Sequence, residues 1–259
     1  MYPERIRRAL AGIVGEEWYL ESPEDRMAYS YDATPLHQVL PDGVVFPAST
    51  EEVQAILELA SREGLKVVPR GSGTNLAAGT VPVEGGLVLV LTRMNRVLEI
   101  DTDNLTARVQ PGVITAPFQA QVEALGLFYP PDPGSNMVST LGGNVAMCAG
   151  GLRGLKYGVT RDYVLGLEAV LPSGEVIRTG GKAMKDVAGY DLTRLLVGSE
   201  GTLAVITEIL LKLVPRPEAK RTLLALFPHL EDAARAVSET IAARIVPATL
   251  EFLDQGTAR

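Results

Sequence analysis

Hydrophobic and polar positions follow two periods along this chain, and the longer period predicts its helices. In residues 3–14, apolar side chains recur at three- and four-residue spacing, which is typical of a helix with one buried face. The same spacing follows Thr50, where two glutamates suit the positive end of a helix and Gly64 ends it. Residues 115–125 repeat the pattern. We therefore predict three helices in the first half of the chain.

Short apolar runs bounded by turn residues predict the strands. These runs occupy residues 66–69, 87–92, 96–101, 105–110, 164–171, 175–179 and 203–214. A strong turn signal, Pro172-Ser173-Gly174, joins two of them. The last run ends at Pro215-Arg216-Pro217, which is our candidate domain boundary.

Beyond that boundary the pattern predicts strand 222–227, helix 230–244 and strand 248–253. These three elements would form one β-α-β unit. A single unit of this kind rarely makes a self-sufficient domain, so we expect only the start of a second domain here.

Composition indicates a globular protein with a substantial core, because 46% of the 259 residues are hydrophobic and 21% are charged. The formal net charge is −7 and the basic residues are scattered, so we expect no nucleic-acid binding. The longest purely apolar run, residues 87–91, is far short of the roughly 20 residues that span a bilayer. We expect a cytoplasmic protein without direct membrane insertion. Attachment through a partner subunit stays open.

Side chains that bind metals or act as nucleophiles are sparse. Cys148 is the only cysteine, which excludes an internal disulfide. His37 and His229 are the only histidines, and neither has a second ligand at metal spacing. We therefore predict no metal site, and the sequence offers no good candidate for a catalytic base.

Glycine is concentrated in three loops. The first follows a predicted strand and consists of Pro69, Arg70, Gly71, Ser72, Gly73, Thr74 and Asn75. Its glycines let backbone N–H groups converge on an anion, and its hydroxyl and amide side chains can add donors, so a diphosphate is the natural guest. It matches neither a P-loop nor the dinucleotide-binding fingerprint. A plain glycine turn is the alternative.

The second loop region, residues 130–158, begins with proline-rich extended backbone and then opens at Gly142-Gly143 and at Gly150-Gly151. A planar apolar guest could lie against it. The alternative is a glycine-rich helix packed closely on a sheet. The third loop, residues 198–201, precedes the strand at 203–214, and an ordinary connection is its alternative. Together, three donor-rich loops favour ligand binding over a scatter of glycines.

Three segments of the chain resemble a known FAD-binding domain, and they read PRGSGTNLAAG, PPDPGSNMVSTLGGNVAMCAGG and GYDLTRLLVGSEGTLAVITEILLKLVPRPE. That domain is shared by the FAD-binding subunit of glycolate oxidase, by D-lactate dehydrogenase and by D-2-hydroxyglutarate dehydrogenase. It belongs to the vanillyl-alcohol oxidase and p-cresol methylhydroxylase superfamily. The similarity extends over about residues 31–254.

The resemblance implies an α+β fold with FAD between two subdomains. The FAD-binding domain would occupy residues 1–214, as two α/β subdomains of about residues 1–104 and 105–214. Residues 215–259 would be the incomplete start of a ferredoxin-like cap domain, the truncated substrate domain. Tyr31-Asp32 resembles a loop that approaches the active site of relatives, with a surface turn as the alternative.

The resemblance also assigns the contacts to FAD. Pro69 and the loop from Arg70 to Asn75 would hold the pyrophosphate through backbone donors. The ribityl and isoalloxazine region would be lined by Pro131, Asp132, Ser135, Gly142, Gly143 and Asn144, and then by Gly150, Gly151, Tyr157 and Gly158. The adenine end would lie beside Gly201, Val205 and Ile206.

The implied activity is oxidation of a small 2-hydroxy acid, such as glycolate or D-lactate, by hydride transfer to the flavin. A quinone, an iron–sulfur partner or oxygen would accept the electrons. The alternative is an FAD-binding subunit or fragment that is catalytically incomplete without a partner or C-terminal half. An NADPH-linked reductase of the same superfamily fits the GSEGTL segment less well. We expect non-covalent FAD, because the first loop lacks His and Cys and Cys148 is the only thiol.

Overall fold

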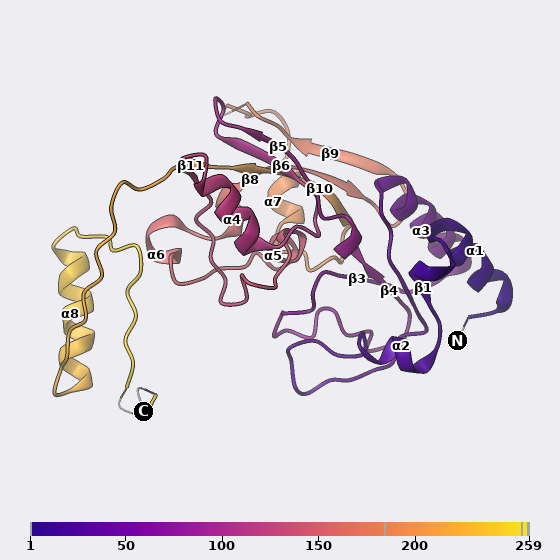
Figure 1. The fold of residues 1–259 in the computed structure, drawn as a ribbon, viewed down its shortest axis with the longest axis horizontal. Helices are drawn as coiled ribbons and strands as arrows, with labels where there is room; N and C mark the ends of the chain where they lie inside the picture. The colour runs from indigo at the N-terminus through magenta and orange to yellow at the C-terminus, as the bar shows by residue number, and fades with distance from the viewer. Residues whose placement is uncertain (1, 184, 255, 258–259) are drawn as a thin grey trace.

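The computed structural model describes residues 2–183, 185–254 and 256–257. Two lobes lie side by side, each built on its own β-sheet, and the C-terminal helix lies apart from both sheets (Figure 1). The mixture of parallel and antiparallel sheets with helices makes this an α+β fold.

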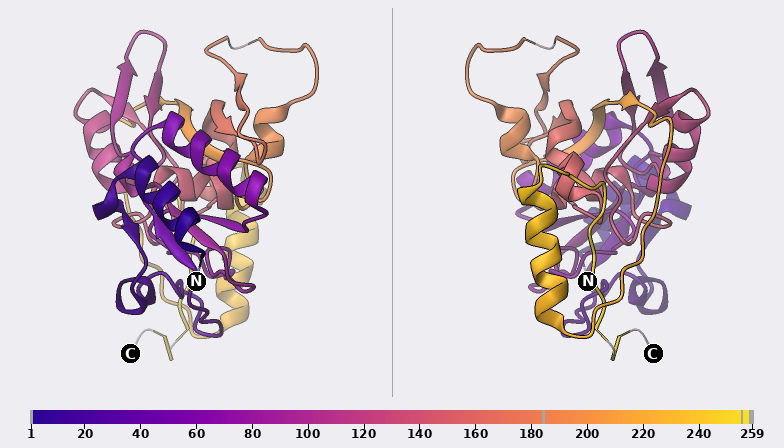
Figure 2. Two further views of the ribbon diagram at one scale, coloured as in Figure 1. Left: turned by 90° about the vertical axis from the view of Figure 1, so that its right-hand side faces the viewer. Right: turned by 90° about the vertical axis from the view of Figure 1, so that its left-hand side faces the viewer.

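The first lobe is a four-stranded sheet covered by helices. Its strands run in the order β1 (Tyr19–Leu20), β2 (Gly43–Val45), β4 (Leu87–Val90) and β3 (Val67–Arg70), with only β1 antiparallel. Helices α1 (Glu4–Val14) and α3 (Thr50–Glu63) bury their apolar faces against one side of it. Both helices lie at the front of the left view in Figure 2. Every residue of β4 is buried, as expected for a central parallel strand covered on both faces.

Helix α3 begins and ends where its sequence allows. The Ser49 hydroxyl accepts from the backbone N–H of Glu52 at 3.3 Å and caps the helix, and Gly64 ends it in a left-handed conformation. The first lobe also contains α2 (Pro23–Met27) and 3₁₀ turns at Glu16–Trp18 and Leu91–Arg93. The helices predicted near residues 3–14 and after Thr50 are confirmed.

The second lobe is a five-stranded antiparallel sheet. Its strands run in the order β5 (Val97–Asp101), β6 (Thr106–Val109), β10 (Val205–Lys212), β8 (Val164–Val170) and β9 (Val176–Gly180). Its helices are α4 (Thr115–Glu123), α5 (Leu141–Met147), α6 (Gly154–Tyr157) and α7 (Leu192–Leu196), with a 3₁₀ turn at Thr160–Tyr163. Helices α4 and α5 share one apolar core with the sheet, and β7 (Leu127–Phe128) pairs with β11 (Val214–Pro215).

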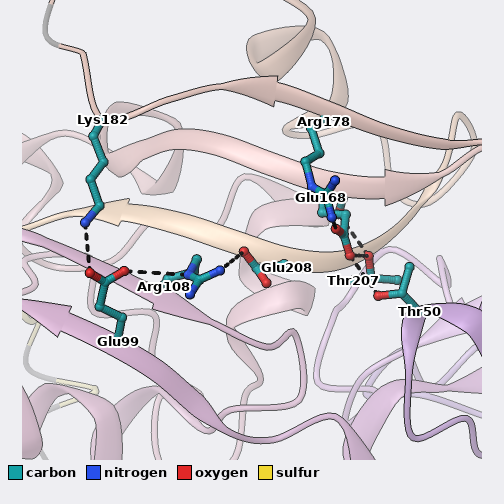
Figure 3. A network of polar contacts seen from close by, with 8 residues as sticks. All are labelled: Thr50, Glu99, Arg108, Glu168, Arg178, Lys182, Thr207 and Glu208. Atoms are coloured by element: carbon teal, nitrogen blue, oxygen red, sulfur yellow. Dashed lines mark hydrogen bonds and ion pairs between the residues drawn. The ribbon is translucent and has the colours of Figure 1, made fainter.

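The opposite face of this sheet carries a row of charges (Figure 3). Arg108 of β6 lies 3.6 Å from a Glu99 carboxylate oxygen and 3.4 Å from one of Glu208. Lys182, just after β9, donates to Glu99 at 3.0 Å and to Asp101 at 2.7 Å on β5. Because β9 and β5 are the two edge strands, Lys182 joins opposite edges of the sheet.

The two lobes are joined by a carboxylate that is 10% exposed and by a shared apolar core. Glu168 of β8 accepts from the hydroxyl of Thr50 at 2.8 Å and from that of Thr207 at 3.0 Å (Figure 3). Thr50 begins α3 in the first lobe, so this carboxylate spans the boundary. Val170 and Val205 of the second sheet belong to the core formed by α1 and α3.

The region after the proline-rich segment differs from prediction. Helix α8 (Leu230–Ala242) is present, but residues 222–227 and 248–253 form no strand. Leu223, for example, is 94% exposed. A strand is stable only when a neighbour completes its hydrogen bonds, and none of the described residues does so for these two segments. Helix α8 closes its hydrogen bonds internally and therefore forms without burying any residue.

Candidate functional site

A cavity of about 350 Å³ lies where the three glycine-rich loops meet. Small-molecule sites in proteins span about 300–1,000 Å³. The predicted site residues that line it are Pro69, Arg70, Gly71, Ser72, Gly73, Thr74, Asn75, Ser135, Gly142, Gly143, Asn144, Gly150, Gly201 and Ile206. The structure therefore brings together residues from three distant parts of the chain.

The first loop leaves its backbone donors available. The loop follows strand β3 and lines the cavity. No described residue accepts a hydrogen bond from the backbone N–H groups of residues 71–75. The side chains of Ser72 and Asn75 are engaged elsewhere. Ser72 donates to the Val138 carbonyl, and Asn75 donates to Thr80 at 3.2 Å while accepting from the N–H of Gly79 at 3.0 Å. An anion here would be held by the backbone, as in other glycine-rich anion sites.

Arg70 supports this loop from beneath. Its side chain is buried, and its Nη1 donates to the Tyr31 carbonyl at 2.7 Å and to the Thr80 hydroxyl at 3.4 Å. A Cβ at Gly73 would overlap Nη2 of Arg70 and lie 2.6 Å from Cζ, and Gly73 has a φ of +71°. Burial lowers the pKa of the Arg70 guanidinium, and Asp32 opposes that effect. Arginine stays charged nonetheless.

Residues 31–34 are bound to the first loop. Asp32 is buried, and its carboxylate accepts from the Thr34 N–H at 2.8 Å and from the Thr80 hydroxyl at 3.3 Å. The Ala33 N–H donates to the Gly73 carbonyl at 3.1 Å. This segment is therefore anchored beside the cavity.

Part of the second glycine-rich segment, including Gly142 and Gly143, forms helix α5, so the helical alternative holds there together with the cavity-lining role. Thr140 caps the helix by accepting from the Gly143 N–H at 3.2 Å. A Cβ at Gly71 would overlap the Thr140 hydroxyl oxygen, and a Cβ at Gly142 would overlap Pro111. Gly71 and Gly142 therefore allow the first loop, α5 and Pro111 to pack closely.

The third loop joins the other two. The N–H groups of Gly198 and Glu200 donate to the carbonyls of Val145 and Ala146, near the end of α5, at 3.0 and 2.9 Å. A Cβ at Gly201 would lie 3.1 Å from Cγ of Pro69. The loop is therefore fixed against both neighbours and is more than an ordinary connection.

Six predicted site residues do not line the cavity, and these are Pro131, Asp132, Gly151, Tyr157, Gly158 and Val205. Gln119 donates to the Pro131 carbonyl at 2.8 Å, and Asp132 forms an ion pair with Arg153 at 3.1 Å. A Cβ at Gly151 would overlap the Asp132 carbonyl oxygen, which explains this glycine by packing.

Tyr157, Gly158 and Val205 have packing or backbone roles away from the cavity. The Tyr157 ring packs edge-to-face on Phe128 with centroids 5.6 Å apart. Gly158 has a φ of +80°, and Val205 is buried in the core that the lobes share. The family resemblance assigned these residues by position in a motif, and motif position does not reveal which way a side chain faces.

The sequence also missed part of the lining. The additional residues are Leu76, Gly79, Thr80, Leu91, Pro111, Ser139, Thr140, Ala146, Met147, Ala149, Glu200 and Ala204. Most stand within a few positions of a predicted residue, so the motif gave their neighbourhood but not their orientation. Cys148 lies outside the lining, in a left-handed conformation at the end of α5.

Two further properties concern the described residues as a whole. Within them, no cluster of three or more His, Cys, Asp or Glu side chains could bind a metal ion. Every helix found there is too short or too polar to cross a membrane.

Comparison with family models identifies the protein family of the chain that forms this cavity. The sequence model of the FAD binding domain matches residues 41–180, more than half of the chain. The chain belongs to this FAD-binding family. The predicted cofactor, FAD, is thereby confirmed, and the C-terminal-domain model of FAD linked oxidases matches residues 216–259.

Curated relatives of this FAD-binding chain carry the names expected from the resemblance. Glycolate oxidase subunit GlcD of Bacillus subtilis is 59% identical over 99% of the chain and 55% of its own length. D-lactate dehydrogenase of Archaeoglobus fulgidus is 44% identical over 88% of the chain and 52% of its own length. The chain thus spans about half the length of these relatives.

Solved structures confirm the fold of this FAD-binding family member. Alkyldihydroxyacetonephosphate synthase matches with a TM-score of 0.83 and 26% identity, over 96% of this chain and 47% of that one. p-Cresol methylhydroxylase with substrate bound matches with a TM-score of 0.82 and 21% identity, over 93% and 48% respectively. The α+β fold predicted from the sequence is therefore confirmed.

The residues around the cavity fit FAD. Unused backbone donors and the buried Arg70 cation suit a diphosphate, while Pro111, Met147 and Ile206 offer apolar surface to a flat ring. At Gly71, Gly73 and Gly142 a Cβ would overlap a neighbour. Glycine at these positions therefore lets the loops come close enough to line one cavity.

Proposed function

We propose that this chain is the flavin-binding part of an FAD-dependent oxidoreductase that oxidises a 2-hydroxy acid, such as glycolate or D-lactate, to the 2-oxo acid. The observation that carries the proposal is the cavity formed by three glycine-rich loops in a member of the FAD-binding family. Relatives named glycolate oxidase subunit and D-lactate dehydrogenase support this class of substrate.

In this proposal the first loop binds the diphosphate through the N–H groups of residues 71–75. Ser135, residues 142–144 and Gly150 border the ribityl and isoalloxazine region, while Gly201 and Ile206 border the adenine end. The apolar wall excludes water from the reacting centre. Bound FAD supplies the acceptor for the hydride of the substrate's carbinol carbon.

The proton of the substrate hydroxyl needs a separate acceptor. Among the described residues that line the cavity, Glu200 has the one carboxylate and there is no histidine. Glu200 lies beside Gly79 near the first loop, at the proposed diphosphate end. The second candidate function is therefore an FAD-binding subunit or fragment that needs residues from a partner or a C-terminal half.

We further propose a domain boundary at residues 214–215, with two subdomains that meet near residue 104. Residues 216–259 match the second family model, which supports that boundary. We also propose partner subunits, because relatives are named as a subunit of glycolate oxidase. The identity of any partner and a cytoplasmic location stay predictions.

The test is anaerobic reduction of the purified chain loaded with FAD. Glycolate and D-lactate are added separately, with L-lactate and acetate as controls, and the absorbance of oxidised flavin near its visible maximum is followed. Bleaching by a 2-hydroxy acid supports the enzyme. Stable binding of FAD without bleaching supports the incomplete subunit, and failure to bind FAD overturns both.

A further inference from the structure

Arg70 is a buried cation without an ionic partner among the described residues. It is 6% exposed and lines the cavity. No carboxylate of those residues lies within 4.0 Å of its guanidinium nitrogens. Asp32 is the carboxylate that acts on it at longer range, and the oxygens of Asp32 already accept from Thr34 and Thr80. A buried charge of this kind is costly unless something compensates it.

The guanidinium of Arg70 also has unused hydrogen-bond donors that face the first loop. Nη1 donates to Tyr31 and Thr80, whereas Nε and Nη2 donate to none of the described residues. These two nitrogens lie against Gly73, since a Cβ there would overlap Nη2 and lie 3.1 Å from Nε. The unused donors of Arg70 and the unused N–H groups of residues 71–75 therefore occur in the same small region.

We propose that Arg70 supplies the buried counter-charge for the diphosphate of FAD, in addition to supporting the loop that binds it. This inference rests on the proposed function, because it needs FAD in the cavity. The chemistry is that of a guanidinium beside phosphate oxygens, an arrangement favoured by both charge and hydrogen bonding. Arg70 would then distinguish ligands that carry a diphosphate from flavins that lack one.

The test measures binding of FAD, ADP and riboflavin to the flavin-free 259-residue chain. ADP carries the diphosphate without the flavin, and riboflavin carries the flavin without the phosphates. Arg70→Gln should weaken FAD and ADP by about 10- to 100-fold, the range expected for a charge-assisted hydrogen bond, and riboflavin by less than about threefold. Arg70→Lys keeps the charge and should fall between Arg70→Gln and the wild type for FAD and ADP.

Arg26 provides the matched control. It is 5% exposed, donates to the carbonyls of Pro41 and Ser22, and does not line the cavity. Arg26→Gln should leave the affinities for all three ligands unchanged, provided that a thermal melt shows a folded variant. It removes a buried arginine from the same lobe and so reports any general effect of such a change.

Salt dependence separates a counter-charge from a support, because a supporting role adds no ligand-binding charge for salt to screen. Added NaCl should weaken FAD and ADP binding to the wild type more steeply than it weakens their binding to Arg70→Gln. Equal salt dependence in the two proteins, or equal losses for all three ligands in Arg70→Gln, would overturn the counter-charge and leave a purely supporting arginine. Absence of FAD binding to the wild type would instead overturn the proposed function.

Discussion

Gly73 is constrained from two directions, by its own backbone and by Arg70 beneath it. At φ +71°, an alanine costs about 1–2 kcal/mol of stability. Its Cβ would also displace the guanidinium that supports the loop. We therefore expect Gly73→Ala to lower the free energy of unfolding and to weaken FAD binding, measured by urea denaturation and FAD titration.

Gly126 separates these two effects. Its φ is +75°, yet a Cβ there would meet nothing within 4 Å. Gly126→Ala should lose a similar amount of stability and bind FAD normally. Equal FAD affinities in the two alanine variants would show that Arg70 tolerates the displacement and that the loop does not depend on it.

Cys148 bears on how the flavin is attached. It lies outside the cavity lining, and none of the lining residues is a histidine or cysteine. Acid precipitation of the FAD-loaded chain should therefore give a colourless pellet and a yellow supernatant. Cys148→Ser should behave in the same way. A pellet that stays yellow in the wild type and turns colourless in the variant would identify Cys148 as a covalent attachment point.

At this scale, the sequence could predict where glycine was needed but not always why. The diphosphate interpretation of Gly73 came from the motif alone. Its contact with Arg70 depends on how the side chain of a residue three positions earlier folds under the loop. Gly71 depends on Thr140, which is 69 positions away in the sequence. Such contacts become visible only once the chain has folded.

Among the elements, α3 and β8 meet at the Glu168 carboxylate, whose side chain is 10% exposed. Glu168→Ala should lower the free energy of unfolding by about 2–3 kcal/mol, because the hydroxyls of Thr50 and Thr207 lose a charged acceptor. Denaturation in urea measures this. Arg178→Ala is the control. Arg178 forms an ion pair with Glu168, but its side chain is 80% exposed, so losing this ion pair should cost less than about 1 kcal/mol.

The edge-to-edge contact of Lys182 predicts a dependence on pH. Hydrogen bonds from Lys182, and then from Asn104, hold the pKa of the Asp101 carboxyl well below its usual value. Because the folded pKa is depressed, the stabilisation is present above the unfolded value of about 3.9 and is lost as the pH falls through the folded one. The Tm of Asp101→Asn should lie below that of wild type at pH 7, and the difference should shrink in acid.

Asp103, in the same exposed turn, is the control, since its side chain forms no hydrogen bond or ion pair with the described residues. Asp103→Asn should have nearly the same Tm as wild type across the range. A constant Tm difference for Asp101→Asn from neutral pH to acid would contradict the assignment to a titrating carboxylate.

The periodicity of the sequence predicted most elements of the two lobes, because most of those patterns have a buried face. It also predicted α8, which buries no residue. It gave no clear helix at α5, where two adjacent glycines are poor helix formers. There the Thr140 cap and close packing against Pro111 outweigh propensity. The opposite error arose at residues 222–227 and 248–253, where a strand-like pattern lacks partner strands in the described residues.

For the whole molecule, the order of the three motifs predicted the fold and the cofactor, because a family that binds one ligand keeps its loops in one arrangement. The substrate is a different matter. The chain spans about half of the relatives that carry a substrate name, and the cavity lining offers no histidine as a proton acceptor among the described residues. The part of the site that would recognise a 2-hydroxy acid therefore cannot be derived from these residues.

The shared core formed by α1, α3, Val170 and Val205 has a consequence for how the cofactor enters and leaves. Two lobes that share apolar packing cannot swing apart on a hinge without exposing that core to water. Residues 2–214 should therefore melt in a single calorimetric transition, one that FAD moves to higher temperature without splitting. Exchange of the cofactor then depends on local opening of the loops around the cavity, which is far cheaper than separating the lobes.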